Sequence, residues 1–529
     1  MTSGEAHVWD LGWRDRVWSS LDEARPWDVI VIGGGITGAG VFREAVRLGM
    51  KALLVEQKDF AWGTSSRSSK LVHGGLRYLR QGHFGVTLHA VRERSRLLRE
   101  KPGLVEPLPF LCPARRDDRL GRLALRTGLY LYDLMAGRLN HRRYDEAEFA
   151  FLAPHLRAAG RDGGFGFADA QTDDARLVLR VIREGVSAGG VALNYASVGS
   201  LLRARSGVEG ITLRDALTGR TAEVRGRVVI NATGAWADGL RGEVGGRARV
   251  RPLRGSHLVF PAWRIPVAQA TMLPHPWGGR PLFIIPWEGA TLLGTTDLDH
   301  DAPLGEEPSI SAQEVTYLMA GVQSALPSLD LSLDDVIASF AGIRPVIGTG
   351  KADPSKESRE HVVWQEEGLV TVTGGKLTTF RLIACDVLQR LRRRLPAASP
   401  NGRRESLGLP PLSLDPSHAR RILGRQGTDA AAFLAAARRE ELREIPGTRT
   451  LWAELRWAAR AEGVVHLDDL LLRRVRLGLL LPGGGMSLME EFRAVCRQEL
   501  GWSDLRWDEE AAAYGRLWRA RYSLPETNP

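Results

Sequence analysis

Three glycines in the pattern Gly33-x-Gly35-x-x-Gly38 constrain this chain more than any other feature of its sequence. They follow a short apolar run, DVIVI, and open a helical segment that ends at Gly49, after which a second apolar run, ALLVE, ends at Glu56. A strand, a glycine turn, a helix and a second strand form a βαβ unit. Glu56 lies about 20 residues beyond the first glycine, where dinucleotide-binding folds place the carboxylate that binds a ribose.

The spacing assigns each glycine a separate task. The first permits the tight turn, the second lets backbone N–H groups approach a pyrophosphate, and the third allows the helix to pack closely on the strand. The positive end of that helix attracts the phosphates. These residues alone fit either NAD or FAD, although a single fingerprint disfavours an enzyme with separate FAD and NAD domains. Phe42 stands where small residues are usual in such helices and predicts a helix displaced slightly from its sheet.

The rest of the chain alternates strand-like and helical segments before it changes character. Apolar runs occur at 190–195, 227–234, 257–260, 281–287 and 369–375, with helical segments such as 174–188 between them. This mixture predicts an α/β core with an inserted, more antiparallel portion. Residues 395–417 are dense in Pro, Ser and Gly and predict a linker, and the helical periodicity of 418–523 predicts a separate helical domain.

Composition narrows the class of protein. A chain of 529 residues with 43% hydrophobic residues has enough apolar content for two or three globular domains. Its net charge of +10 favours anionic partners such as phosphorylated substrates, acidic lipids or nucleic acid. Its three cysteines, Cys112, Cys385 and Cys496, are too far apart for a metal knuckle and too few for a disulfide framework. No run of about 18 apolar residues occurs, so we expect a protein that is neither secreted nor membrane-spanning.

The stretch TSSRSSKLVHGGLRYL, residues 64–79, carries hydroxyls, cations and a Gly-Gly pair. With the glycine fingerprint it resembles the FAD-dependent glycerol-3-phosphate dehydrogenase family of the aerobic, respiratory type. Other segments match in the same order: DDARLVL (173–179), NATGAWAD (231–238), GSHLVF (255–260), GIRPVIG (342–348) and GGKLTTFR (374–381). The resemblance covers about residues 26–390 and continues weakly at 466–481.

The resemblance implies an α/β fold. Its Rossmann-like FAD-binding domain is of the glutathione-reductase/D-amino-acid-oxidase type, with an inserted antiparallel-sheet substrate domain and a C-terminal helical domain. The boundaries that we expect are an N-terminal extension (1–25), an FAD-binding domain within 26–395 (about 26–100, 150–240 and 340–395), a substrate domain (about 101–149 and 241–339), a linker (396–417) and a helical domain (418–529).

FAD contacts follow from the same resemblance. They come from the glycine turn, the ribose carboxylate, a hydroxyl cluster, the backbone of the Gly-Gly segment, a residue beside the adenine and two further turns. The residues are Gly33, Gly35, Gly38, Glu56, Thr64, Ser65, Ser66, His73, Gly75, Leu76, Val198, Thr233, Gly234, Lys376, Leu377, Thr378 and Thr379. Hydroxyls and close main-chain approach suit a flat polar ring that needs in-plane hydrogen bonds.

The implied reaction is oxidation of sn-glycerol 3-phosphate at C2 to dihydroxyacetone phosphate, by hydride transfer to flavin N5. A phosphate dianion needs forked cations, and Arg77 and Arg344 stand in matching segments. Tyr78 and Lys376 complete the expected substrate contacts. His257 is the expected general base because an imidazole pKa near ~6.5 suits proton removal around neutral pH, and His73 is the alternative. The catalytic residues would thus be His257, Arg344 and Lys376, whereas Arg67 and Lys70 have no assigned role.

The family resemblance also implies a cytoplasmic enzyme, peripheral on the inner face of the cell membrane, that passes electrons to a quinone. The alternative that the sequence distinguishes least well from this dehydrogenase is an oxidase that reduces oxygen to hydrogen peroxide. The enzyme could also form a homodimer. A basic flavoprotein that binds or modifies RNA is a remote alternative. It has little support because the cations near the cofactor motifs are few and interleaved with apolar residues, so we expect no nucleic-acid partner.

Two stretches have the composition of membrane-surface helices. Residues 115–138 mix arginines with leucines, as basic interfacial helices do. In the N-terminal extension, Trp9, Trp13, Val17 and Leu21 recur every four residues and form one helical stripe. In each case the alternative is that the stripe packs on its own domain.

Overall fold

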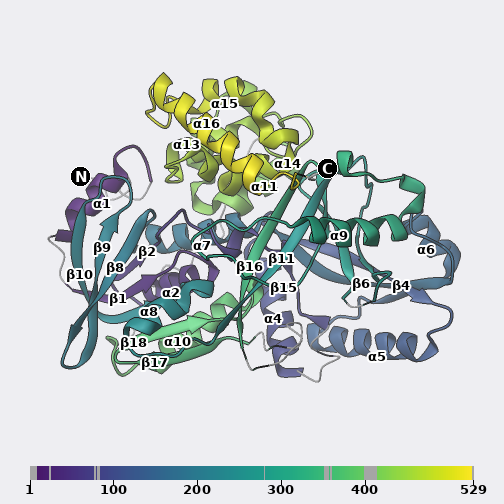
Figure 1. Cartoon of the computed structure of the whole chain (residues 1–529), viewed down its shortest axis with the longest axis horizontal. Helices are drawn as coiled ribbons and strands as arrows, with labels where there is room; N and C mark the ends of the chain where they lie inside the picture. The colour runs from purple at the N-terminus through teal and green to yellow at the C-terminus, as the bar shows by residue number, and fades with distance from the viewer. Residues whose placement is uncertain are drawn as a thin grey trace.

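The computed structural model describes residues 9–22, 26–76, 79, 84–278, 280–348, 350, 357, 360–397 and 414–526. Two sheets organise these residues (Figure 1). The first has the order β17-β18-β10-β1-β2-β7, with β9 paired along β10 and β8 paired along β9. Its strands are β1 (Trp27–Ile32), β2 (Ala52–Val55), β7 (Val191–Leu193), β8 (Ala196–Ala204), β9 (Gly207–Asp215), β10 (Thr221–Asn231), β17 (Val362–Glu366) and β18 (Leu369–Thr373).

Strand β1 lies at the centre of the first sheet and pairs in parallel with β10 and β2. Strands β18 and β7 extend the sheet in parallel on either side. Four of the six residues in β1 form a buried Val/Ile run, as expected for a parallel strand whose two faces are both covered. The predicted βαβ unit is therefore confirmed at the centre of an α/β core.

Helices α2 (Ile36–Arg47), α7 (Asp174–Ser187) and α10 (Phe380–Arg390) pack together beside this sheet. The Phe42 side chain of α2 is fully buried, and a Cβ atom added to Gly185 of α7 would lie 2.5 Å from its ring. The missing side chain of Gly185 gives the ring its space, so Phe42 fills the α2–α7 contact instead of separating α2 from the sheet. The displacement predicted from Phe42 is wrong.

The second sheet has the order β15-β11-β14-β13-β12-β4-β6-β3, with β16 along β11 and β5 along β6. All its pairings are antiparallel except β12 with β4. Its strands are β3 (Leu71–Val72), β4 (Val105–Arg115), β5 (Arg142–Tyr144), β6 (Arg161–Thr172), β11 (Val250–Pro261), β12 (Ala270–Leu273), β13 (Leu282–Trp287), β14 (Ala290–Gly294), β15 (Leu298–Asp299) and β16 (Ala338–Ile347).

This pairing differs from the boundaries expected from the sequence at three places. Strands β3, β6 and most of β16 fall in ranges that we assigned to the FAD-binding domain, yet all three hydrogen-bond within the second sheet. Strand β16 matches β11 over ten consecutive residue pairs, from Val250 opposite Ile347 to Val259 opposite Ala338. Strand β16 also contacts the 3-10 turns η1 (Thr64–Ser66) and η2 (Gly234–Trp236), so residues at this junction serve both domains.

The N-terminal helix α1 (Trp13–Asp22) packs on the first sheet and not on a membrane. Trp9, Trp13 and Leu21 are buried, and the ring of Trp9 stacks on Phe60 at 5.1 Å. The Arg14 guanidinium donates to an Asp215 carboxylate oxygen at 2.8 Å. The interfacial interpretation of this stripe is therefore wrong, because the periodicity reflects packing on the chain's own domain.

The C-terminal part is helical, as predicted, and forms the upper region of Figure 1. Its helices are α11 (Pro416–Gln426), α12 (Ala430–Ala436), α13 (Trp452–Ala461), α14 (Leu477–Leu480), α15 (Met489–Cys496) and α16 (Asp504–Arg521). Most of the predicted linker, residues 398–413, lies outside the described residues. A single apolar cluster runs from Phe110 and Trp287 of the second sheet to Leu470 and Trp507. The helical region thus shares its core with the second sheet.

The remaining helices of the described ranges pack on strands of the two sheets or on neighbouring helices. They are α4 (Phe84–Glu100), α5 (Arg119–Ala136), α6 (Glu146–Leu152), α8 (Ala237–Glu243) and α9 (Ala312–Ala325). None of the helices in the described ranges combines the length and the apolar character needed to cross a membrane.

Candidate active site

The fingerprint glycines form a turn that excludes any side chain. Gly33 has a φ of +112°, and a Cβ atom there would lie 2.6 Å from the Ala232 carbonyl oxygen. A Cβ atom on Gly38 would lie 1.9 Å from the Gly33 carbonyl oxygen. Distances this short mean that neither position accepts alanine without a backbone shift. The N-terminus of α2 is therefore held directly against the end of β1, where a pyrophosphate would meet its free N–H groups.

Glu56 follows β2 and lies beside this turn. Its carboxylate accepts hydrogen bonds from the Gly34 N–H at 2.7 Å and from the Lys58 N–H at 2.9 Å. Burial raises the pKa of Glu56 above its ordinary value, although both N–H groups act in the opposite direction. The Ala196 N–H donates to the Glu56 carbonyl oxygen at 2.8 Å, so Val198 lies two residues further along β8. These contacts bring the predicted ribose and adenine residues to one edge of the sheet.

The hydroxyl cluster Thr64–Ser66 forms a short 3-10 helix, η1, between the two domains. The Ile36 N–H at the start of α2 donates to Ser65 Oγ at 3.0 Å. On the other side, the Thr64 hydroxyl donates to the carbonyl oxygen of Ile343 in β16. The cluster thus joins the helix N-terminus that faces a pyrophosphate to the sheet that carries the predicted substrate residues.

Segments about 300 residues apart in the sequence meet at the same place. The His73 N–H donates to Thr378 Oγ1 at 3.2 Å, which joins the HGG segment to the 3-10 helix η6 (Leu377–Thr379). The Thr373 hydroxyl donates to the Gly234 carbonyl oxygen at 3.0 Å. Gly75 has a φ of +81°, a conformation that favours glycine. Lys376 and Leu377 lie in this junction, directly before and at the start of η6.

The residues present fit an FAD. Between β1 and α2 the backbone turns without side chains, and around Gly234 a Cβ atom would find only Pro345, at 3.9 Å. Gly374 and Gly375, with φ values of +77° and +79°, make a second side-chain-free turn before η6. Two glycine turns without side chains, together with the hydroxyl cluster, offer the close backbone approach that a pyrophosphate and a flat polar ring require.

His257 lies on β11 and is buried. Its ring stacks on Phe340 of β16 at 4.6 Å and 10° between planes, and its Nε2 lies 2.9 Å from Ser69 Oγ. Among the described residues no hydrogen-bond partner lies near its Nδ1. Burial, followed by the positive charges of Arg344 and Lys70, holds the pKa of His257 well below its ordinary value. The imidazole is therefore neutral near pH 7 and able to accept a proton.

Arg344 projects from β16 across β11. A Cβ atom on Gly255 would lie 2.2 Å from its Nη2, so the guanidinium occupies the space that this glycine leaves. Arg344 Nη1 donates to Asp297 Oδ1 at 2.9 Å, and Nη2 donates to Thr295 Oγ1 at 2.9 Å. Asp297 also pairs with Arg280. These contacts fix the plane of the Arg344 guanidinium group, which lies close to His257. The other two expected substrate residues, Arg77 and Tyr78, lie outside the described residues.

Comparison with known proteins places this arrangement in a family. Residues 28–384 match a family model described as FAD-dependent oxidoreductase, and residues 373–507 match the C-terminal domain of α-glycerophosphate oxidase. Glycerol-3-phosphate dehydrogenase 2 of Mycobacterium tuberculosis is 36% identical over 516 residues, which cover 92% of this chain and 87% of that protein. The chain belongs to the FAD-dependent glycerol-3-phosphate dehydrogenase family. This confirms the resemblance and the predicted cofactor class.

Two further relatives agree with this glycerol-3-phosphate dehydrogenase assignment. The aerobic glycerol-3-phosphate dehydrogenase of Bacillus subtilis is 36% identical over 388 residues, covering 72% of this chain and 69% of that protein. The crystal structure of glycerol-3-phosphate dehydrogenase from Bacillus halodurans, complexed with FAD, superimposes with a TM-score of 0.76 at 27% identity. That match covers 97% of this chain and 98% of the other, so the fold of this dehydrogenase family extends into the helical region.

Sequence reasoning missed several residues of the dehydrogenase site. Ser69 contacts His257, and Asp297 holds Arg344, but neither entered the expected set. Asp174 accepts from Lys70 Nζ through both carboxylate oxygens at 2.9 Å and from the Ser68 hydroxyl at 2.7 Å. Burial and the nearby Arg476 charge lower the pKa of Lys70 to about 7, although Asp174 opposes this. Asp174 belongs to the matching DDARLVL segment, and that signal was available in the sequence.

Proposed function

We propose that this dehydrogenase oxidises sn-glycerol 3-phosphate to dihydroxyacetone phosphate. The observation that carries the proposal is the juxtaposition of the Arg344 fork and the neutral, buried His257 at the junction with the FAD-binding domain. In this substrate the phosphate dianion and the C2 hydroxyl stand on adjacent carbons, so Arg344 could bind the phosphate while His257 contacts the hydroxyl. The names of the relatives at 36% identity support the same substrate.

Each residue would have a separate task. Arg344 would bind the phosphate bidentately through its remaining N–H groups, since Asp297, Thr295 and the Thr296 carbonyl already hold its guanidinium group in one plane. Arg77 and Tyr78 would add to this contact, and Lys376, before η6, would bind the substrate at its cofactor side. His257 would accept the C2 hydroxyl proton while Ser69 holds the ring in place. FAD, when bound, would supply the hydride acceptor for C2.

We propose His257, and not His73, as the general base. His73 uses its backbone N–H to join the HGG segment to Thr378, which is a structural task. His257 lies beside Arg344, near enough for that positive charge to lower its pKa. A base adjacent to the phosphate-binding fork is well placed for the C2 hydroxyl, which is one carbon away from the phosphate ester.

The first prediction concerns reduction of the bound flavin. Under anaerobic conditions, sn-glycerol 3-phosphate should bleach the absorbance of the yellow holoenzyme, whereas glycerol should leave it unchanged because glycerol lacks the phosphate that Arg344 binds. An absorbance titration checks this. A flavin that stays oxidised with glycerol 3-phosphate would overturn the proposed substrate.

The electron acceptor that we propose is a membrane quinone. The alternative is oxygen, and the similarity of residues 373–507 to a domain of α-glycerophosphate oxidase favours keeping it. The two acceptors differ in their product. Purified protein that turns over in air with one hydrogen peroxide per substrate would establish the oxidase, while slow turnover in air and fast turnover with a soluble quinone would establish the dehydrogenase.

Helix α5 supports the proposed membrane contact. It lies at the lower edge of Figure 1, away from the helical region. Its inner side is buried through Leu129 and Tyr132, as the packing alternative predicts, but its outer side exposes 83% of Leu120 and 62% of Leu123. Arg119 at the start of the helix is exposed beside these leucines. Exposed leucines next to arginines suit the boundary of an anionic lipid surface.

The second prediction tests this surface. The double substitution L120Q/L123Q should reduce binding to vesicles that contain anionic lipid at least tenfold, because about 25 cal/mol is lost for each Å² of apolar surface that no longer enters the lipid. Vesicle sedimentation measures the binding. L505Q is the matched control, since Leu505 on α16 is 70% exposed but lies in the helical region. Equal binding by the double variant and the wild type would exclude α5 as the contact.

A further inference from the structure

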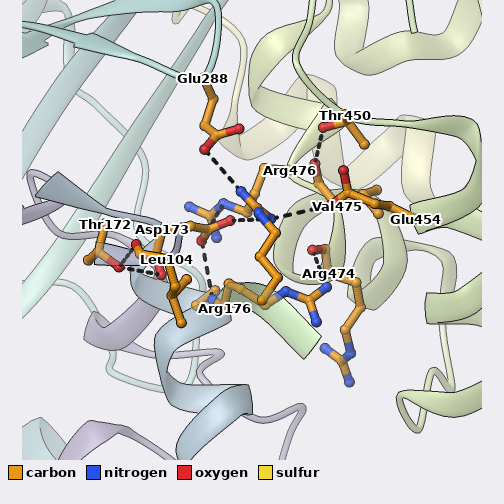
Figure 2. Close-up of polar contacts among 12 residues, drawn as sticks. Leu104, Thr172, Asp173, Arg176, Glu288, Thr450, Glu454, Arg474, Val475 and Arg476 are labelled. Atoms are coloured by element: carbon orange, nitrogen blue, oxygen red, sulfur yellow. Dashed lines mark hydrogen bonds and ion pairs between the residues drawn. The ribbon is translucent and has the colours of Figure 1, made fainter. Parts of the chain in front are cut away.

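The helical region docks on the FAD-binding domain through buried ion pairs. Arg176 of α7 donates to both carboxylate oxygens of Glu462, at 2.5 and 2.9 Å, and to the Arg474 carbonyl oxygen at 2.8 Å. Figure 2 shows Arg176 and Asp173 at the start of α7 facing the segment Arg474–Arg476. All these side chains are buried. A charge left in such an interface without its partner is strongly unfavourable, so the contact fixes how the two parts sit together.

Arg476 reaches the Thr64–Ser66 turn of the FAD-binding domain, whereas its neighbours Arg473 and Arg474 pair with Asp59. Its Nη2 donates to the Ser66 carbonyl oxygen at 2.7 Å and lies 3.4 Å from Asp174 Oδ1. Its Nη1 donates to the Leu472 carbonyl oxygen at 2.8 Å, within its own segment. The residue has a φ of +63°, a left-handed conformation that is unfavourable for residues other than glycine. The surrounding packing therefore holds Arg476 in this position against a backbone cost.

The Ser66 carbonyl is held by two cations from two parts of the chain. Lys70 Nζ donates to the same oxygen at 2.6 Å and to both oxygens of Asp174. Both cations also lie over the indole ring of Trp287, at 5.4 Å for Lys70 and 5.6 Å for Arg476. Lys70 belongs to the same loop as Ser66, whereas Arg476 comes from the helical region. Only Arg476 ties this carbonyl to a separate domain.

The opposite side of the loop faces the proposed cofactor. Ser65, the residue before Ser66, accepts the Ile36 N–H at the start of α2, and Thr64 donates to β16. The three residues form one turn of 3-10 helix, so a shift of the Ser66 carbonyl moves the two hydroxyls with it. A bond at one end of this turn is thus transmitted to the groups that would contact FAD.

We propose that Arg476 is a positioning residue for FAD, through which the docked helical region holds the Thr64–Ser66 turn in its cofactor-binding geometry. This inference rests on the proposed contact of that turn with FAD. It gives the helical region a task in cofactor retention, and it accounts for a buried arginine in an unfavourable backbone conformation. It also accounts for Lys70, whose ammonium shares the Ser66 carbonyl.

The experiment compares two buried arginines of the same interface. R476Q removes the bond to Ser66, and R176Q removes an ion pair of similar burial that does not touch the cofactor turn. Both holoenzymes should have a lower Tm than the wild type. Only R476Q should release FAD more readily, with a dissociation constant at least tenfold higher by flavin fluorescence and a shifted visible spectrum of the bound flavin. R476K should recover part of this affinity, because an ammonium can still donate to the carbonyl.

S65A separates failure of this inference from failure of the proposed FAD contact. If S65A weakens FAD binding but R476Q binds FAD as tightly as R176Q does, Arg476 has only a structural role and the inference is wrong. If neither S65A nor R476Q changes FAD affinity, the Thr64–Ser66 turn does not contact FAD. Both the proposed FAD contact and the inference about Arg476 are then wrong. If R476Q does not fold, R476M decides, because methionine fills similar space but cannot donate to the Ser66 carbonyl: FAD affinity equal to that of the wild type, at a lowered Tm, contradicts the proposal.

Discussion

Replacing Arg344 with alanine should lower kcat/KM for sn-glycerol 3-phosphate about 1,000-fold, mostly through a higher KM. A bidentate guanidinium–phosphate contact contains two charge-assisted hydrogen bonds, each worth about 1.5–3 kcal/mol, and about 1.4 kcal/mol corresponds to a factor of ten. The fold should survive, because Asp297 keeps its second partner, Arg280. Steady-state kinetics of the FAD-loaded variant measures the effect.

Arg264 offers a matched control for this prediction. Like Arg344 it pairs with an aspartate, Asp335, and has a side chain that is 22% exposed. It lies beyond the far end of β11, about 25 Å along the strand from the position opposite Arg344 at a rise of about 3.3 Å per residue. R264A should therefore leave kcat/KM unchanged. R344K should be only partly active, since a lysine offers a point charge and not a fork. Wild-type kinetics in R344A would remove this arginine from the phosphate site.

Replacing His257 with asparagine should lower kcat about 1,000-fold, with a small change in KM. General-base catalysis contributes about 100- to 10,000-fold, and asparagine keeps a polar side chain of similar size without a basic nitrogen. H275N is the control, because His275 is also buried in the second sheet region and stacks on an aromatic ring, that of Tyr317. An H257N variant with the wild-type kcat would transfer the role of base to another group.

The pH profile gives an independent check on His257. Because its pKa in the folded protein lies well below the ordinary 6.5, the imidazole stays neutral from pH 8 down through 6.5, and kcat/KM should fall only at lower pH as the ring is protonated. The unfolded chain takes up this proton first, near pH 6.5. The free energy of unfolding should therefore fall as the pH falls below 6.5, and H257N should lose this contribution. An acid limb above pH 6.5 would contradict the assignment.

The turn between β1 and α2 and the meeting of two distant segments could be predicted from the sequence. The glycine spacing and Glu56 predicted the turn between β1 and α2, and the matching segments around His73 and Thr378 do meet in the structure. These features are encoded locally, in backbone conformations that only glycine adopts easily and in a carboxylate at a fixed distance from them. Local chemistry of this kind is visible without knowing the rest of the fold.

The partners of the predicted residues were not predictable in the same way. Ser69 and His257 are 188 positions apart, and their contact depends on how β11 pairs with β14 and β16. Nothing local distinguishes Ser69 from the four other hydroxyl residues around it. The interpretation of the N-terminal apolar stripe as a membrane-surface helix was wrong for a related reason. A period of four residues identifies an apolar face, but a protein surface and a lipid surface satisfy that face equally, and here the partner is Phe60.

The pairing order of the first sheet affects how this chain can fold during synthesis. Strand β1 can pair early with β2, but its other neighbour is β10 (Thr221–Asn231), and β10 pairs in turn with β18 (Leu369–Thr373), which is made long after β1. The apolar cluster of the second sheet is completed only by residues beyond 450. A ribosome-bound chain would therefore carry one side of the first sheet unpaired until β10 and β18 are made, and an uncovered apolar second sheet until the helical region has emerged. Contacts so distant in sequence form slowly. Yield of active enzyme should accordingly depend on chaperones and on translation speed more than on the stability of the finished protein.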